Sequence, residues 1–255
     1  AKKLSIDNTV IICGTNKRKL SENKNSNIKK FECDVSNKRS VLKFSALIEK
    51  RFKKIDVLVN CAGTYGGIGK FYDLSFEKWK EAIEINFFGT FLVCKYFIKF
   101  LKKSKIKKII NFSGGGAFYP FPNYSSYATS KAAVVRFTET IAEELKSEKI
   151  TVNCIAPGFV ATKIHERTLK IGPKFSGKNF FKETLSKIKS GGTPYEKIFD
   201  CLNFLISKKS KNLSGKTISV NFDPWQSKKF HKYIDDLQNT DELCMRRVNL
   251  KKKLK

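Results

Sequence analysis

The chain has 255 residues, 41% of them hydrophobic, and a formal net charge of +28 at pH 7. This length and apolar content predict a single domain (residues 1–255) with a sizeable core, and no apolar run reaches the roughly 18 residues of a membrane-spanning helix. The high positive charge raises the question of a nucleic-acid or membrane partner, but the lysines are dispersed and favour a solvated surface. The exception is the basic cluster at residues 251–255.

Seven cysteines are scattered without paired C-x-x-C spacing, which is typical of reduced cysteines in a cytoplasmic protein. No amino-terminal segment combines basic, apolar and cleavage regions, so nothing indicates secretion.

Taken in order, the chain alternates predicted strands and helices. Strands are expected at residues 9–13, 28–33, 56–60, 109–113, 151–155 and 215–220. Amphipathic helices are expected at residues 41–52, 75–101, 124–145 and 196–207. This alternation predicts an α/β, Rossmann-like, doubly wound parallel sheet in three layers, with ligands at the carboxyl ends of the strands. Residues 159–192 predict an irregular substrate lobe, and residues 223–255 form a carboxyl-terminal extension that either packs over the site or contacts another subunit.

The chemistry centres on Tyr127 and Lys131, which are four residues apart on a predicted helix and therefore share one face. A neighbouring ammonium favours the phenolate, so this pair predicts a tyrosine with a lowered pKa. In a lysine-rich chain with eight tyrosines the spacing arises by chance, and an exposed helical pair is the plain alternative.

The order of the surrounding segments separates these interpretations. The chain resembles the short-chain dehydrogenase/reductase family over about residues 10–220. The matching motifs are Val59-Asn60-Cys61-Ala62-Gly63, Asn86, Tyr127-Ala128-Thr129-Ser130-Lys131 and Val152-Asn153-Cys154-Ile155-Ala156-Pro157-Gly158.

The resemblance implies hydride transfer between NAD(P)(H) and a small carbonyl or secondary alcohol. Tyr127 would be the general acid and base, Lys131 would hold the nicotinamide ribose, and Asn86 would kink its helix and hold a water. The implied coenzyme contacts are Asp34, Val35, Asn60, Ala62, Gly63, Lys131, Pro157, Gly158 and Thr162.

The serine of the site departs from the family pattern. The family places it one residue nearer the tyrosine, at the position of Gly114. Ser113 supplies the substrate hydrogen bond only if the Gly114-Gly115-Gly116 loop shifts the register. Otherwise it faces the core at the end of its strand.

The strand at residues 9–13 resembles the second strand of the family sheet. The first strand and its glycine-rich phosphate-binding turn are then missing, through truncation or real loss, and truncation is favoured. Residues 14–18 contain no acid that would bind an adenine ribose, whereas Lys17 and Arg18 could reach a 2′-phosphate. NADP is therefore favoured over NAD.

The leading hypothesis is a cytoplasmic NAD(P)-dependent oxidoreductase that forms a dimer or tetramer through residues 75–101 and 124–145. The alternative is a catalytically inactive or truncated Rossmann remnant that acts as a binding module. Only His165 and His231 are present, so neither a metal site nor a nucleophilic triad is expected. Without a basic stripe that alternates with aromatic residues, specific nucleic-acid binding is not expected either.

Overall fold

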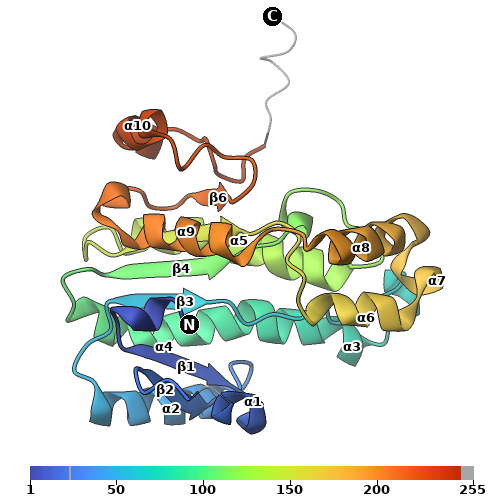
Figure 1. The fold of residues 1–255 in the computed structure, drawn as a ribbon, viewed down its shortest axis with the longest axis horizontal. Coiled ribbons are helices and arrows are strands. Elements are labelled where there is room, and N and C mark those ends of the chain that lie inside the picture. Colours follow the sequence, from blue (N-terminus) through green and yellow to red (C-terminus); the bar gives the residue numbers. More distant parts are fainter. Residues whose placement is uncertain (23, 248–255) are drawn as a thin grey trace, which may run out of the picture.

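The computed structural model describes residues 1–22 and 24–247, and its strands lie side by side as one parallel layer in two parts (Figure 1). A two-stranded sheet pairs the first two strands, and a four-stranded sheet has the order β3-β4-β5-β6. The strands are β1 (Val10–Gly14), β2 (Ile28–Glu32), β3 (Val57–Asn60), β4 (Lys108–Phe112), β5 (Thr151–Ala156) and β6 (Thr217–Ser219).

Helices connect successive strands, as a parallel sheet requires. The α-helices are α1 (Lys17–Ser21), α2 (Lys38–Arg51), α3 (Phe76–Ala82), α4 (Gly89–Lys102), α5 (Ser125–Glu144), α6 (Ile164–Ile171), α7 (Pro173–Ser176), α8 (Lys178–Ser190), α9 (Tyr195–Ile206) and α10 (Lys228–Gln238). Helices α2 and α3 begin with polar side-chain caps. Asn37 Oδ1 accepts the Ser40 amide at 3.0 Å before α2, and Ser75 Oγ accepts the Lys78 amide at 3.4 Å before α3.

Alternation along the strands builds a core on each face of the sheet. Ile109 packs with α2, α4 and α5, whereas its neighbour Ile110 packs with α9 and β6. Because successive strand residues point to opposite faces, a continuous apolar run such as this one requires helices on both sides. The predicted three-layer, doubly wound parallel sheet is confirmed.

The amino-terminal strand is Val10–Gly14, and it pairs with β2 in parallel register. Within the described residues it has no ladder to β3, so the layer is divided at this point. An upstream strand with a glycine-rich turn stays a prediction.

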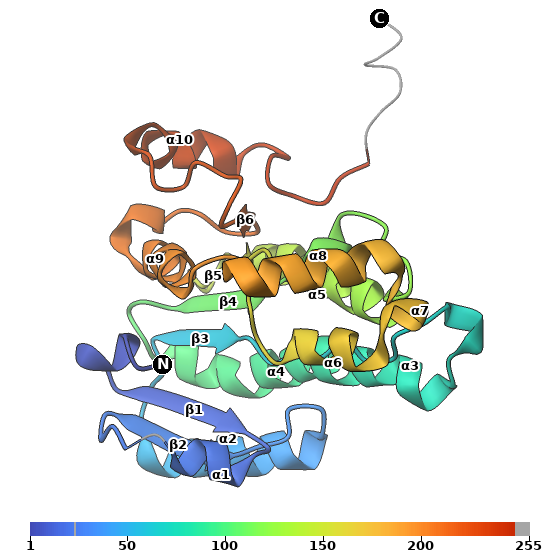
Figure 2. The same cartoon turned by 45° about the vertical axis from the view of Figure 1, so that its right-hand side comes forward.

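The carboxyl-terminal extension packs away from the predicted substrate lobe. Trp225 and the α10 residues Phe230, Ile234 and Leu237 are buried against the α9 and β6 core. Helix α10 lies beyond α9 and β6, whereas α6, α7 and α8 lie at the carboxyl ends of the strands (Figures 1 and 2). The α10 part of the extension therefore packs away from the site, whereas Met245 packs against the cluster that contains Ala117, and both expected placements stay predictions. The basic cluster at 251–255 lies outside the described residues.

Candidate active site

Tyr127 lies in the first turn of α5, half-buried at the carboxyl edge of the sheet. Its hydroxyl lies against the backbone of Gly114, so closely that a Cβ built on Gly114 would be 2.1 Å from the Tyr127 oxygen. Any side chain at position 114 would therefore displace the phenol. The phenol fills the space that a serine at this position would use.

Lys131 lies one turn further along α5 and is buried. Its Nζ donates to the Phe112 carbonyl at 2.8 Å and lies 5.9 Å from the centroid of the Tyr127 ring. The spacing thus brings the two side chains to one side of the helix, as predicted.

The electrostatic consequence differs from the prediction. Burial raises the pKa of Tyr127 to about 12 and lowers the pKa of Lys131 to about 8. The ammonium is directed at the Phe112 carbonyl, and loss of hydration disfavours the charged form of both groups. This arrangement therefore does not give the lowered phenol pKa that the i, i+4 spacing predicts.

Asn86 is fully buried in a π-helical turn (Ile83–Phe88) between α3 and α4, and the kink expected at this residue stays a prediction. Its Nδ2 donates to the Thr64 carbonyl at 2.9 Å and to Ser130 Oγ at 2.8 Å, and its Oδ1 accepts the Thr64 amide at 2.8 Å. A Cβ on Gly63 would lie 3.4 Å from Asn86 Oδ1 and 3.6 Å from Lys131 Nζ. The Asn86 and Lys131 side chains therefore meet at Gly63, and the bound water stays a prediction.

Ser113 is buried directly after β4. Its amide donates to the Ile155 carbonyl at 2.9 Å, and its Oγ lies 3.5 Å from the Gly114 carbonyl. These contacts attach Ser113 to the end of β4 and to its own loop. They favour the core-facing alternative, and a role as substrate donor stays a prediction.

The predicted coenzyme contacts near the nicotinamide end lie after β3 and β5. Ala62 and Gly63 are exposed after β3, and Gly158 is exposed after β5 with Pro157 half-buried before it. Asn60 differs, because its Nδ2 donates to Asn111 Oδ1 at 2.9 Å and thereby ties β3 to β4.

Thr162 is exposed at the start of the predicted substrate lobe. Its carbonyl accepts the His165 amide at 3.1 Å, which leaves the proposed role of its hydroxyl untested.

The residues predicted at the adenine end lie on the β1–β2 side. Asp34 is exposed, and its Oδ1 accepts hydrogen bonds from the Ser36 amide at 3.0 Å and the Ser36 hydroxyl at 2.6 Å. Val35 packs on Gly89. Lys17 is ion-paired with Glu32 at 3.1 Å, and Arg18 contacts Glu22 at 3.9 Å. Asp34 thus forms a turn just before α2, and its role as a coenzyme contact stays a prediction.

An aromatic cluster beside Tyr127 was missed from sequence. Tyr65 contacts the Tyr127 ring edge-on with centroids 4.8 Å apart, and Phe121 contacts it at 6.2 Å. Tyr124 and Phe180 complete the cluster. The i, i+3 spacing of residues 121, 124 and 127 was the available signal, whereas Tyr65 and Phe180 come from distant segments.

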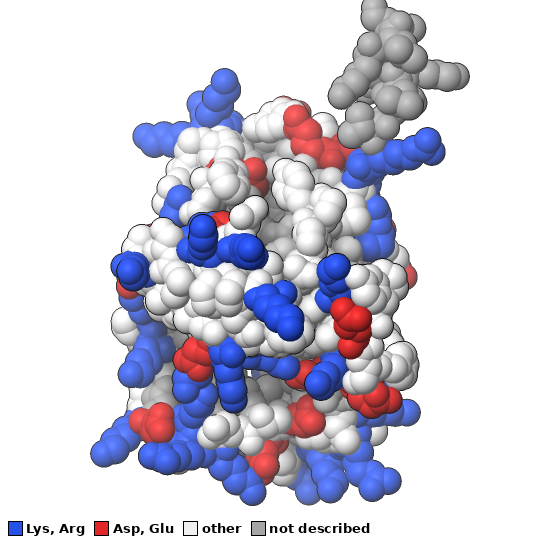
Figure 3. All heavy atoms as spheres, turned by 90° about the vertical axis from the view of Figure 1, so that its right-hand side faces the viewer, with Lys and Arg blue, Asp and Glu red and all other residues white. Residues whose placement is uncertain are grey.

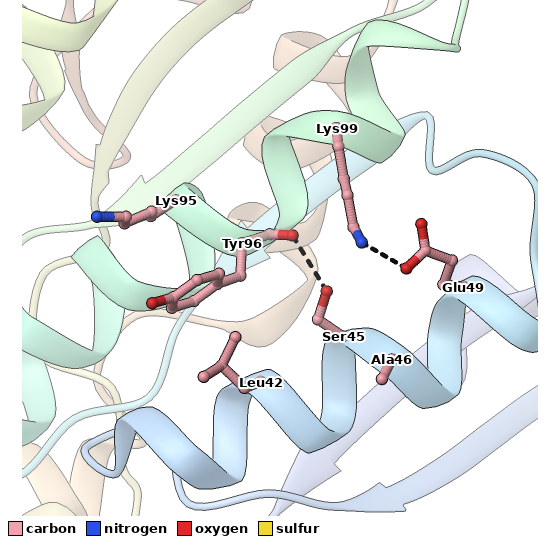
Figure 4. A pocket seen from close by; sticks show the side chains of 7 residues that line it. All are labelled: Leu42, Ser45, Ala46, Glu49, Lys95, Tyr96 and Lys99. Atoms are coloured by element: carbon pink, nitrogen blue, oxygen red, sulfur yellow. Dashed lines mark hydrogen bonds and ion pairs between the residues drawn. The ribbon is translucent and has the colours of Figure 1, made fainter.

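The sheet edge that carries these residues faces the viewer in Figure 3, where Lys and Arg crowd the lower part, over the β1–α2 region. A surface hollow of ≈ 250 Å³ lies elsewhere, between α2 and α4 (Figure 4). It is lined by Leu42, Ser45, Ala46, Glu49, Lys95, Tyr96 and Lys99 and shares no residue with the candidate site. Among the described residues no cluster of three His, Cys, Asp or Glu could hold a metal, and no helix is long and apolar enough to cross a membrane.

Comparison with known proteins decides the family. The sequence model described as "short chain dehydrogenase" matches residues 2–170. The chain belongs to the short-chain dehydrogenase family. This places it among the NAD(P)-dependent oxidoreductases and agrees with the resemblance of its motifs.

Other short-chain dehydrogenases are similar over much of this chain. This chain is 36% identical to a 3-oxoacyl-[acyl-carrier-protein] reductase of Synechocystis sp.. The match covers 53% of this chain and 54% of that relative, so the chain spans about half of the relative's length. It is 31% identical to glucose 1-dehydrogenase 2 of Bacillus subtilis and 33% identical to the short-chain reductase NovJ of Streptomyces niveus. Each of these two matches covers 74% of this chain and 71% of the relative.

Solved structures of the family show the same fold. An NAD+-bound xylitol dehydrogenase superposes with a TM-score of 0.75 at 23% identity, covering 85% of this chain and 89% of that one. The ligand-free aldohexose dehydrogenase of Thermoplasma acidophilum gives a TM-score of 0.70 at 25% identity, covering 83% and 82%.

Proposed function

We propose that this short-chain dehydrogenase transfers a hydride between NAD(P)(H) and a small carbonyl or secondary alcohol, with Tyr127 as the proton donor and acceptor. The observation that carries the proposal is that three side chains lie at the carboxyl edge of the sheet, with Lys131 Nζ 5.9 Å from the Tyr127 ring centroid. The Tyr127 hydroxyl reaches Gly114, while Lys131 and Asn86 both reach Gly63. A positioned acid with a buried cation one helical turn away is the arrangement that proton transfer to a carbonyl oxygen requires.

The residues present fit a nicotinamide coenzyme. Exposed small residues at the ends of β3 and β5, among them Ala62, Gly63 and Gly158, let a flat ligand approach the backbone, and Lys131 provides a donor for ribose hydroxyls. Asp34, Val35, Asn60, Pro157 and Thr162 are the further proposed contacts. When bound, the coenzyme supplies or accepts the hydride, and the residues of the chain hold and move the proton.

NADP is the proposed coenzyme, with NAD as the alternative. Lys17 and Arg18 lie beyond β1 with mostly exposed side chains, and their ion pairs to Glu32 and Glu22 lie in solvent. Such exposed pairs contribute little, so a 2′-phosphate can replace the carboxylate partners.

The first experiment measures oxidation of NADPH and NADH with 3-oxoacyl thioesters, and reduction of NADP+ and NAD+ with aldoses, the substrate types that the names of two relatives suggest. Tyr127→Phe removes the proposed acid and is expected to abolish turnover, whereas Tyr119→Phe removes an exposed phenol and serves as the matched control. Equal rates for the wild type and Tyr127→Phe would remove Tyr127 from the mechanism.

A second candidate is a catalytically inactive Rossmann protein that binds its ligand without turnover. The glycine at position 114, where the family places its serine, favours it. Coenzyme binding by fluorescence titration, with no turnover of any carbonyl and no loss of affinity in Tyr127→Phe, would support this reading.

The remaining proposals concern partners and location. Exposed Phe88 and Phe91, at 48% and 37%, make the surface around the start of α4 suitable for a homodimer or homotetramer contact. The free cysteines agree with a cytoplasmic location. We propose no specific nucleic-acid or membrane partner.

A further inference from the structure

Tyr65 and His165 form a buried pair beside Tyr127 that the proposed chemistry does not use. The Tyr65 side chain follows β3, His165 lies in the first turn of α6, and they are only 3% and 5% exposed. The Tyr65 hydroxyl and His165 Nδ1 are 3.0 Å apart.

Both members of this pair are neutral. Burial outweighs a hydrogen bond to the Val160 carbonyl and, together with a smaller effect of the Lys187 ammonium, lowers the pKa of His165 to about 4. Burial also raises the pKa of the Tyr65 phenol. A neutral phenol and a neutral imidazole satisfy each other, and losing one partner would leave a buried polar atom unpaired.

The hydrogen bond fixes the position of the Tyr65 hydroxyl, and with it the end of the Tyr65 side chain, because hydrogen bonds are directional. The Tyr65 ring stands edge-on to Tyr127 at an interplanar angle of 79°. On its other side the imidazole is stacked on Phe159, with centroids 3.8 Å apart. A continuous series of rings therefore runs from Phe159 through His165 and Tyr65 to Tyr127.

The first turn of α6 makes a second contact with the same loop. Arg167 Nη1 donates to Thr64 Oγ1 at 2.6 Å and to Glu81 Oε1 at 2.9 Å. Thr64 is the residue whose backbone holds the Asn86 amide. Two adjacent residues of the β3 loop are thus held by α6, and each of them contacts a residue of the proposed active site.

We propose that Tyr65 and His165 are positioning residues for Tyr127. The position of α6 against the loop after β3 then sets the orientation of the catalytic phenol. The inference rests on the proposed function, because it treats Tyr127 as the proton donor. It assigns a role in catalysis to the start of the substrate lobe, through ring contact and without touching the reacting atoms.

The test compares three variants with a matched control. Tyr65→Phe keeps the ring and removes the hydroxyl, His165→Leu removes the imidazole, and His165→Asn keeps a polar atom close to the place of Nδ1. The control, Tyr124→Phe, removes a different phenol that also bonds to α6, through Thr168 Oγ1 at 2.8 Å, and whose ring packs on Tyr65 and Phe121.

Two readouts are measured for each protein. In carbonyl reduction, Tyr65→Phe and His165→Leu are expected to lower kcat by roughly tenfold with a smaller change in KM, and His165→Asn to recover most of the loss. In the NMR spectrum of ring-labelled tyrosine, the Tyr127 resonance, assigned by its loss in Tyr127→Phe, is expected to shift or broaden in the two damaging variants. Tyr124→Phe is expected to change neither readout.

An unchanged Tyr127 resonance in Tyr65→Phe would overturn the inference, as would an equal loss of kcat in Tyr124→Phe, which would indicate general anchoring of the lobe. The NMR measurement does not depend on turnover. A protein without activity would therefore refute the proposed function and still decide whether Tyr65 orients Tyr127. If His165→Leu does not fold, Tyr65→Phe alone carries the test.

Discussion

The glycine at position 114 allows the sharpest test of how Tyr127 works. A Cβ built there would lie 2.1 Å from the phenol oxygen and 2.9 Å from the ring carbon that bears it, whereas ordinary contacts begin at 3.4 Å. In Gly114→Ala the hydroxyl must therefore move by about 1 Å, and a misplacement of that size costs on the order of 100-fold in rate.

The expected result is a loss of kcat of about 100-fold with a folded protein. The group that must move is the end of a side chain and not backbone, so the thermal unfolding midpoint should change little. Gly115→Ala is the matched control, because a Cβ at Gly115 meets nothing within 4 Å.

Gly114→Ser distinguishes two accounts of the site. If this protein simply lacks a serine that its chemistry could use, the new hydroxyl would add an oxyanion donor and raise the rate by up to about 100-fold. If the phenol occupies that space, as the geometry indicates, Gly114→Ser loses activity like Gly114→Ala. A serine variant faster than the wild type, in coenzyme oxidation at saturating carbonyl, would refute our reasoning.

Three further variants test the electrostatics and the binding residues. Lys131→Met should abolish turnover. It should also raise the free energy of unfolding at pH 7 by roughly 3 kcal/mol, because it removes a charged ammonium that burial disfavours. The loss of the hydrogen bond to the Phe112 carbonyl reduces this gain. In denaturant titrations this gain should shrink between about pH 8 and about pH 10.4, where the native wild type has lost the proton that the unfolded chain still binds; a gain independent of pH would contradict it. Ser113→Ala should leave kcat within about twofold, whereas a loss near 100-fold would show that its hydroxyl is the oxyanion donor. Lys17→Ala combined with Arg18→Ala should raise KM for NADPH by roughly three- to tenfold and leave KM for NADH unchanged, and equal changes for both coenzymes would argue against a 2′-phosphate contact.

The sequence predicted the centre of the sheet well because β4 and β5 are buried on both faces. The run Lys108–Phe112 contains adjacent isoleucines that pack on opposite helical layers, so the apolar run itself carries the signal. The observed strand β5 (Thr151–Ala156) extends the prediction by one residue. Strand boundaries shift by one or two residues because ladder ends depend on the neighbouring strand.

The predicted helix at 75–101 shows where periodicity is insufficient. It is divided into α3, a π-helical turn and α4, and Asn86 lies in that turn. A π turn inserts one residue without changing composition, so only the motif around Asn86 indicated it. The tertiary bonds from Asn86 to Thr64 and Ser130, residues distant in sequence, depend on how the chain folds.

The structure brings the predicted residues Tyr127, Lys131 and Asn86 to the carboxyl edge of the sheet, and it adds two neighbours that the sequence did not indicate. Tyr65 and His165 are 100 residues apart, and His165 was considered only for metal binding and nucleophilic chemistry. Neither residue belongs to a motif, and their pairing follows from the packing of α6 on the β3 loop. Such pairs become visible only when the fold brings the loops after β3 and β5 together.

The direction in which the pKa of Tyr127 shifts could be known only from the folded structure. That direction determines which half of the proton transfer the tyrosine favours. Spacing places Lys131 beside Tyr127, but the pKa of each group depends on how much water its surroundings exclude. With the Tyr127 pKa raised to about 12 and the Lys131 pKa lowered to about 8, both protons are in place near neutral pH. A protonated phenol can give its proton to the oxygen of a carbonyl at once, whereas abstraction of a proton from an alcohol first requires its ionisation. The arrangement therefore suits reduction more than oxidation near neutral pH, with Lys131 as the group whose charge changes first as the pH rises.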